Sequence, residues 1–328
     1  MAFATNRRAA GGKLQYYLAG NRFFGLICPC PVAPVVSSMS FDIEKMNKLP
    51  VEARFFDVNE IWYFMNRWVV RLLYPTSVTP NQITVLSLVF GLASAGFYIS
   101  GIPDALVWGA VFLYGKVFFD NVDGNLARVR GTTSRFGRFI DSLTDFGVTV
   151  LVYVAVTIVL VRTTGASEYW VLGLLGLVAC FLQSTFFVFY LVNYTSRAGS
   201  YEKNRVDESV TEEDRANAEK ADPWDLRLQI LFVWVYGWQD KMVEQLDALC
   251  RRLAHVPDTE EVLRDWYSDR GFLARISPLC LCTNNIMLVV FSLLDQLELF
   301  LILLISLMNF YALGLLAWKV FNRRLPGG

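Results

Sequence analysis

The sequence predicts an all-α integral membrane protein with six transmembrane helices preceded by an amphipathic interfacial helix, and three observations lead to this prediction. First, 54% of the 328 residues are hydrophobic and 18% are charged, with a mean hydropathy of +0.38. Soluble domains are nearer about 45–50% apolar and about 25% charged. Second, six stretches have or approach the roughly 20 apolar residues that a helix needs to cross a bilayer. Third, positive charges lie mainly on one side of these stretches, as in multi-pass membrane proteins.

The six predicted spans alternate across the membrane. They cover residues 82–101, 104–121, 138–161, 169–193, 277–294 and 297–320. The connections between spans 1 and 2, 3 and 4, and 5 and 6 contain Arg162 as their single basic residue, whereas the opposite side holds many arginines. The positive-inside rule therefore predicts that both termini and the connection between spans 2 and 3 are cytoplasmic.

Residues 55–74 are expected to form an amphipathic helix on the cytoplasmic surface of the membrane. Apolar side chains recur every three or four residues, at Phe55, Val58, Trp62, Met65, Val69 and Leu72. Arg67 and Arg71 lie between them, and tryptophans such as Trp68 are typical anchors at a membrane interface. A helix packed on a soluble core is the alternative, and we disfavour it because residues 1–54 do not resemble a soluble domain.

The predicted organisation has four segments. Residues 1–54 form a cytoplasmic leader that we expect to be poorly ordered; a basic pair and an apolar run resemble a signal peptide, but Pro31 and Pro34 interrupt the run. Translation from Met39 or Met46 stays open. Residues 55–195 hold the interfacial helix and spans 1–4, residues 196–275 form a cytoplasmic helical insertion, and residues 276–328 hold spans 5 and 6.

The insertion has two parts of different composition. Residues 201–222 are strongly charged and predict a solvated helix or a linker. Residues 224–254 have apolar side chains at helical spacing, with four aromatic residues between Phe232 and Trp238. This second part could lie on the membrane, cover a functional site or pack on the cytoplasmic face of the bundle, and we favour the last.

Composition and cysteine spacing exclude several kinds of site. Lysine plus arginine and aspartate plus glutamate balance at 30 each, so no net charge favours a nucleic-acid partner, and we expect none. His255 is the only histidine, which argues against histidine-based triads and metal sites. Cys28, Cys30, Cys280 and Cys282 lack the two-residue gaps of zinc sites, so we interpret all six cysteines as reduced thiols.

One acidic motif lies where the predicted spans 2 and 3 meet the cytoplasm. Residues 120–145 read D-x2-D-G-x2-A-R-x8-G-x3-D-x3-D. Asp120 and Asp123 are three residues apart and Asp141 and Asp145 are four apart, so on helices each pair shares one face. A carboxylate at the centre of a membrane helix costs roughly 2.5–3.5 kcal/mol, and four of them require compensating cations. We therefore predict a site for two divalent ions, Mg²⁺ or Mn²⁺ with Ca²⁺ as a further candidate, that could clamp a diphosphate.

The other fixed positions of the motif have physical roles of their own. Gly124 allows a ligand or backbone to approach beside Asp123, and Gly137 leaves space on the carboxylate stripe of its helix. Arg128 can pair with a phosphate oxygen. Salt bridges between the aspartates and nearby arginines are the structural alternative, but they would account for one or two pairs rather than four acids with two glycines.

The motif resembles the signature of the CDP-alcohol phosphotransferase (CDP-alcohol phosphatidyltransferase) family at every fixed position. The segment Val78-Thr79-Pro80-Asn81-Gln82-Ile83-Thr84 is also similar to the Pro-Asn-x-x-Thr entry into the first span of that family. The resemblance covers residues 55–195 well and spans 5 and 6 by architecture alone. Residues 1–54 and 196–275 depart from the compact bacterial members.

The resemblance implies a transfer from a CDP-linked lipid donor to an acceptor hydroxyl with release of CMP. Carried over by position, Asp120, Asp123, Asp141 and Asp145 would hold two divalent ions, and Asp145 would also be the base that takes the acceptor proton. The residues that would shape the CDP site are Gly124, Ala127, Arg128 and Gly137, with Asn81 lining it. We also expect a homodimer surrounded by membrane lipids.

Several functional alternatives stay open at this point. The donor could be CDP-diacylglycerol with a small alcohol as acceptor, or a CDP-alcohol with a lipid hydroxyl as acceptor. We favour the first, because the chain has six predicted spans rather than ten and residues 80–195 are as compact as in bacterial members. An arginine cluster of Arg135, Arg138 and Arg197 would suit a phosphorylated acceptor, although each arginine could equally follow from the positive-inside rule. A cation transporter is a different class, disfavoured because the acids cluster at the cytoplasmic ends. A catalytically silent scaffold would be expected to have lost at least one of the four acids.

Overall fold

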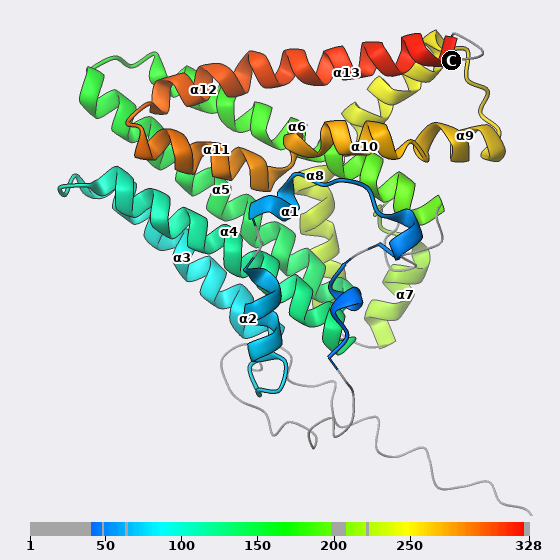
Figure 1. Cartoon of the computed structure of the whole chain (residues 1–328), viewed down its shortest axis with the longest axis horizontal. Coiled ribbons are helices and arrows are strands. Elements are labelled where there is room, and N and C mark those ends of the chain that lie inside the picture. Colours follow the sequence, from blue (N-terminus) through cyan, green and yellow to red (C-terminus); the bar gives the residue numbers. More distant parts are fainter. Residues whose placement is uncertain (1–40, 48, 63–64, 198–207, 221–222, 325–328) are drawn as a thin grey trace, which may run out of the picture.

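The computed structural model describes residues 41–47, 49–62, 65–197, 208–220 and 223–324, and every regular element in these residues is helical, as predicted (Figure 1). The long helices are α3 (Pro80–Ser100), α4 (Ala105–Arg130), α5 (Arg135–Thr164), α6 (Tyr169–Arg197), α8 (Pro223–Leu253) and α13 (Leu307–Arg324). The shorter elements are η2 (Ile43–Met46), η3 (Val51–Ala53), α1 (Asn59–Trp62), α2 (Asn66–Leu73), α7 (Glu212–Lys220), α9 (Glu260–Tyr267), α10 (Arg270–Ile276), η4 (Ser277–Leu279), α11 (Leu281–Leu293) and α12 (Leu297–Ile305).

The helices that could cross a membrane agree with the predicted multi-pass fold. Five helical stretches in the described residues are long and apolar enough, at 80–100, 105–130, 137–164, 169–197 and 297–323. A sixth span is formed if the pair 270–279 and 281–293, bent by 41°, is counted as one. Two boundaries differ from the prediction: α4 continues past Asp120 to Arg130, and the bent span begins inside the predicted insertion, at Arg270.

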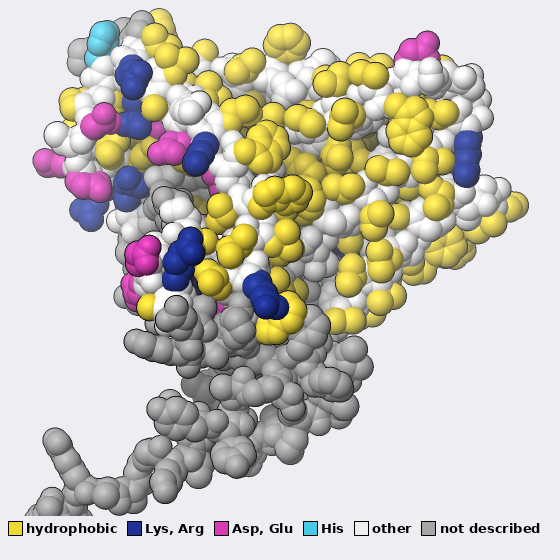
Figure 2. Space-filling view, turned by 180° about the vertical axis from the view of Figure 1, so that it is seen from behind, with side chains coloured by type: hydrophobic (Ala, Val, Ile, Leu, Met, Phe, Trp, Pro, Cys, Tyr) yellow, Lys and Arg dark blue, Asp and Glu magenta, His cyan; other side chains and the backbone are white. Residues whose placement is uncertain are grey.

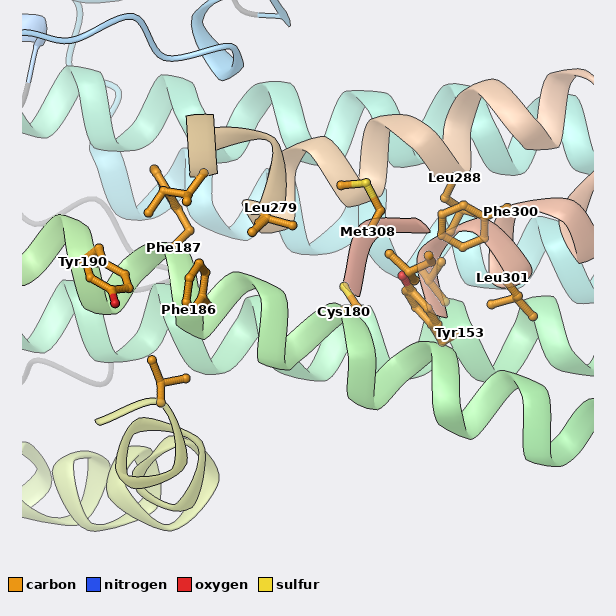
Figure 3. Packing of buried hydrophobic residues seen from close by; sticks show 14 of the residues in the cluster. Tyr153, Cys180, Phe186, Phe187, Tyr190, Leu279, Leu288, Phe300, Leu301 and Met308 are labelled. Atoms are coloured by element: carbon orange, nitrogen blue, oxygen red, sulfur yellow. The ribbon is translucent and has the colours of Figure 1, made fainter. Parts of the chain in front are cut away.

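The core lies where the membrane helices meet. Helix α3 packs along α4 and against α5, and α11 closes on the opposite side of α4. Side chains from α5, α6, α11, α12 and α13 and from η4 interlock in one cluster, in which Tyr153, Leu288 and Phe300 are buried (Figure 3). Close contact is possible because small residues face the partner helix: a Cβ atom on Gly91 would lie 2.5 Å from Val148 Cγ1.

The surface is divided into an apolar part and a charged end. Figure 2 shows hydrophobic side chains over most of one face, while charged side chains gather towards the end that carries α7, α9 and the end of α13. Exposed leucine, valine and phenylalanine side chains lie all along α3, α6, α12 and α13. A surface of this kind is suited to lipid contact.

The predicted helix over 55–74 is helical only in part of its described length. Residues 55–58 lie outside any helix, and α1 and α2 follow on either side of residues 63–64, which lie outside the described residues. The backbone N–H of Val58 donates to Ser277 Oγ at 3.2 Å, and this long-range contact holds the chain in a non-helical path. Helix α2 buries Asn66 and Val70, whereas Trp68 and Leu72 are 62% and 73% exposed. The exposed apolar side chains are compatible with a membrane surface, but the interfacial position stays a prediction.

The flanking segments pack on the bundle where the structure describes them. Residues 1–40 of the predicted leader lie outside the described residues, while Leu49 and Ala53 are buried and the Ala53 carbonyl accepts from Tyr194 Oη at 2.7 Å. In the insertion, α8 packs on α5 and α6, which is the arrangement we favoured for residues 224–254. The charged part includes α7, which packs on α8, and residues 198–207, which lie outside the described residues.

Candidate active site

The acidic motif lies on two helices, α4 and α5, that are joined by a tight turn. Gly131 ends α4 with a φ of +66°, a conformation that glycine adopts without a steric penalty. Ser134 then caps α5, because its Oγ accepts from the Gly137 backbone N–H at 3.0 Å. This turn places the Asp120–Asp123 pair of α4 and the Asp141–Asp145 pair of α5 at the same end of the bundle.

A third helix contributes to the site through the start of α3. Thr79 caps α3 in a reciprocal arrangement with Gln82, at 3.0 and 3.3 Å, and Pro80 occupies the first turn. One turn further, Thr84 Oγ1 donates to Asp123 Oδ2 at 2.5 Å. The threonine of the Pro-Asn-x-x-Thr segment therefore positions an acid of the motif, a contact that the sequence analysis did not assign to it.

The four carboxylates lie close enough to interact electrostatically. The charges of Asp141, Asp120 and Asp145 all act on Asp123, which is only 5% exposed. Asp120 and Asp145 each retain 18% side-chain exposure. The site thus gathers negative charge from α4 and α5 at a place that solvent reaches only in part.

A buried lysine that the sequence analysis missed balances part of this charge. Lys116 is 2% exposed and donates from Nζ to Asp120 at 3.3 Å and to Asp145 at shorter range. Its position four residues before Asp120, on the same helix face, was the signal that could have revealed it. A lysine on a membrane helix that pairs with acids of α4 and α5 is a functional candidate, because charged side chains in membrane helices are costly and usually have a function.

The donor set fits a hard divalent cation. Carboxylate oxygens are the preferred ligands of Mg²⁺ and Mn²⁺, and the site already holds one cationic group, the ammonium of Lys116, between two of its acids. Within the described residues, however, no three acidic, thiol or imidazole side chains are already arranged so that they could hold a metal ion. Binding of cations would therefore require side chains such as Asp145 to exchange Lys116 for a metal ion.

The remaining predicted site residues occupy different surroundings. Gly124 lies beside Arg128, where an added Cβ would be 3.3 Å from Nη1. Arg128 Nε donates to the Met46 carbonyl at 2.7 Å and its Nη2 bonds Asn125, so its guanidinium is engaged by the predicted leader. Ala127, in the last turn of α4, is half-buried and accepts from Thr132 N at 2.9 Å, and Asn81 is exposed at the start of α3.

Helix α8 covers the α5 side of the site, which sequence reasoning did not decide. Tyr236 Oη donates to the Ser142 carbonyl at 2.8 Å, and its ring lies 6.1 Å from that of Phe146. Burial, followed by the negative charges of Asp145 and Asp141, raises the pKa of Tyr236 far above its ordinary value. Tyr236 is therefore a neutral hydrogen-bond donor at the edge of the site.

The predicted cysteine and arginine groupings have other roles. Cys180, Cys250, Cys280 and Cys282 are free thiols, as expected, while Cys28 and Cys30 lie outside the described residues. The arginines proposed for an acceptor phosphate are all bonded to acidic or amide groups of this chain.

Changing Lys116 to methionine is expected to lower stability by about 1–3 kcal/mol, because two partly buried carboxylates lose their counter-charge. Thermal unfolding in detergent without divalent ions measures the effect. Lys116→Arg should retain most of the stability, and Lys241→Met, at an exposed position of α8, should unfold at the same temperature as the parent. A Lys116→Met protein as stable as the parent would show that the ion pairs contribute nothing.

Comparison with known proteins identifies the family of the chain. A family model described as CDP-alcohol phosphatidyltransferase matches residues 77–252, more than half of the chain. The chain is similar to a phosphatidylinositol phosphate synthase of Streptomyces avermitilis, with 42% identity over 69 residues that cover 21% of this chain and 27% of the relative. It is also similar to an archaetidylinositol phosphate synthase of Pyrococcus horikoshii, with 38% identity over 76 residues covering 23% and 38% of the two chains.

A third relative carries a different name. It is a CDP-diacylglycerol–serine O-phosphatidyltransferase of Mycobacterium leprae, with 35% identity over 101 residues that cover 30% of this chain and 31% of the relative. The matched stretches thus span between about a quarter and two fifths of the lengths of these three relatives. The match to the family itself extends from the start of α3 to the end of α8 and includes the whole acidic motif. The chain therefore belongs to the CDP-alcohol phosphatidyltransferase family.

Proposed function

We propose that this protein transfers a phosphatidyl group from CDP-diacylglycerol to the hydroxyl of a small alcohol and releases CMP. The observation that carries the proposal is the group of four interacting carboxylates on α4 and α5, within the family motif. The name of the Mycobacterium leprae relative supports CDP-diacylglycerol as the donor. Transfer of a head group from a CDP-alcohol to a lipid hydroxyl is the second candidate, supported by the family alone.

The proposed chemistry assigns a role to each group of the site. Asp120, Asp123, Asp141 and Asp145 would hold two divalent ions, whose positive charge would neutralise the diphosphate and stabilise the leaving oxygen. The acceptor oxygen forms a bond to the lipid-linked phosphorus, and the bond from that phosphorus to the bridging oxygen breaks, so that its electron pair leaves with CMP. Asp145 accepts the acceptor proton. Thr84 holds Asp123 in place, and Tyr236 with the rest of α8 limits access of water on the α5 side.

The site is proposed to face the cytoplasm, where CDP-linked donors are present. The charged end of the molecule carries α7, α9 and the end of α13, and the short turns at 101–104, 165–168 and 295–296 lie at the other ends of the helices. The excess of arginine at the charged end favours this orientation. A homodimer stays a prediction, which cross-linking in native membranes would test.

Chelation of divalent ions is expected to abolish CMP release. The measurement uses the purified protein in lipid micelles with CDP-diacylglycerol, a panel of small alcohols and Mg²⁺, before and after EDTA. Added Mg²⁺ or Mn²⁺ should restore the rate of CMP release. In the Asp141→Asn variant, a higher metal concentration should be needed to reach half of the maximal rate. A protein that releases no CMP with any donor, CDP-alcohols included, would refute the proposed function, and full activity in EDTA would refute the metal assignment.

A further inference from the structure

Two arginines at the start of α5 are bonded to two acids of the insertion. Arg135 binds Asp214 Oδ1 at 2.9 Å and Glu208 Oε2 at 2.6 Å, and Arg138 binds the second oxygen of Glu208. We call these four residues the acid clamp. Glu208 and Asp214 are 70 to 79 residues from the arginines along the chain, so the clamp depends entirely on how the insertion packs.

The acidic half of the clamp is held in place by its own contacts. Asp214 is 7% exposed and accepts from Thr211 N at 3.0 Å, from Thr211 Oγ1 at 2.9 Å and from Gln229 Nε2 at 3.0 Å. Gln229 is itself buried on α8 and also donates to the Glu208 carbonyl at 3.1 Å. These contacts fix the Asp214 carboxylate and the backbone of Glu208 before any substrate arrives.

The basic half is equally constrained. The guanidinium carbons of Arg135 and Arg138 lie 5.2 and 5.4 Å from the ring centre of Phe139, which is 1% exposed. The Phe139 ring packs on Phe232 of α8, with centroids 5.0 Å apart. The guanidinium groups of both arginines therefore lie against the Phe139 ring, which packs on α8, at the positions where the acids meet them.

The arginines of the clamp lie in the turn of α5 that precedes the Asp141–Asp145 pair. Arg138 is three residues before Asp141 on α5, which places the two on one face of the helix and about 4.5 Å apart along its axis. Arg197, the third arginine that could meet an acceptor phosphate, bonds Asn193 Oδ1 at 2.6 Å and stacks over Tyr267 at 4.6 Å. All three predicted phosphate-binding arginines are thus engaged by groups of this chain.

A phosphorylated acceptor would meet this arrangement unfavourably. The two arginines and two carboxylates of the clamp cancel in charge, so the clamp offers no net attraction to an anion. A phosphate placed at the arginines would either displace Glu208 and Asp214 or lie beside them, and like charges in contact are strongly disfavoured. A neutral hydroxyl compound meets neither obstacle.

Resting on the proposed function, we infer that the acid clamp makes this enzyme select an unphosphorylated alcohol as the acceptor. Glu208 and Asp214 are then specificity-determining residues, and the insertion is the element that brings them to the site. In the intact chain, the positive charge that would bind a phosphate is neutralised before the acceptor enters.

Matched acceptor pairs test the inference in the intact protein. CMP release is measured with inositol against inositol 1-phosphate, and with glycerol against glycerol 3-phosphate, with CDP-diacylglycerol and Mg²⁺ present. The neutral member of each pair should have a kcat/KM about tenfold higher or more, the usual scale for a misplaced charge. Equal or better use of the phosphorylated members would overturn the inference and leave the proposed function standing.

A variant protein and a binding measurement complete the test. Glu208→Gln with Asp214→Asn should raise kcat/KM for the phosphorylated members about tenfold or more by removing the repulsion. Glu212→Gln, on the exposed side of α7, should leave kcat/KM unchanged for both phosphorylated acceptors. Calorimetric titration with inositol 1-phosphate decides the question even where no CMP is released: binding gained only in the double variant supports the clamp, and equal binding by the parent and the variant overturns it.

Discussion

Changing Asp145 to asparagine is expected to lower the rate of CMP release about 10²–10⁴-fold, the range typical of a lost general base. Asparagine is nearly the same size and its side-chain oxygen can still accept a hydrogen bond from Lys116. It cannot take a proton from the acceptor hydroxyl and is a poor ligand for a divalent ion. The fold should therefore survive while the chemistry is lost.

The control for this change is an aspartate that is far from the site. Asp104 and Asp295 are exposed in turns at the opposite ends of the helices, with φ of +58° and +56°. Asparagine adopts this conformation as readily as aspartate, so Asp104→Asn and Asp295→Asn should retain full activity. Full activity in Asp145→Asn would contradict the assignment of the base, provided that the variant has the thermal stability of the parent.

The kinetic pattern separates the role of Asp145 from that of Thr84. Thr84→Val removes the hydroxyl that donates to Asp123 and should have a smaller effect, since it changes the position of an acid without removing one. Its activity should recover in Thr84→Ser, which restores the hydroxyl. In contrast, Asp145→Glu should recover little, because a longer side chain places the carboxylate elsewhere relative to Lys116.

The sequence was sufficient to predict the fold and the position of the motif. Apolar stretches long enough to cross a bilayer are a local property, so the helices at 80–100, 169–197 and 297–323 could be located to within a few residues. The spacing of Asp141 and Asp145 is also local, because it determines a helix face before any packing is known. The predicted span 2 ended at residue 121 because polar and charged residues follow it, whereas helix α4 continues to Arg130.

The sequence was not sufficient where distant segments meet. Nothing local indicates that Glu208 would reach Arg138, or that Tyr236 would bond to Ser142. Lys116 is an intermediate case: its spacing from Asp120 is visible in the sequence, but its contact with Asp145 depends on how α4 and α5 pack. Contacts between distant segments set the electrostatics of the site, and in our proposal they select the acceptor.

Replacing Asp247 of α8 with alanine is expected to lower the free energy of unfolding by about 3–5 kcal/mol, the scale of a broken buried ion pair. Asp247 is 1% exposed and accepts from Tyr190 Oη at 2.7 Å, Tyr267 Oη at 2.5 Å, Trp266 Nε1 at 3.0 Å and Arg251 Nε at 3.0 Å. Four donors from α6, α8 and α9 therefore lose their acceptor at once. Thermal unfolding in detergent measures the loss.

The same arginine offers a matched control. Asp258 also pairs with Arg251, but it is 81% exposed, and exposed pairs contribute little because water screens them. Asp258→Ala should leave the melting temperature nearly unchanged, whereas Asp247→Ala should lower it by about 5 °C or more. Burial, followed by the charge of Asp247, raises the pKa of Tyr267 well above its ordinary value, so Tyr267 is a neutral donor to this carboxylate in the parent protein. Equal melting temperatures for the two variants would show that the insertion is held to α6 by apolar packing rather than by this carboxylate.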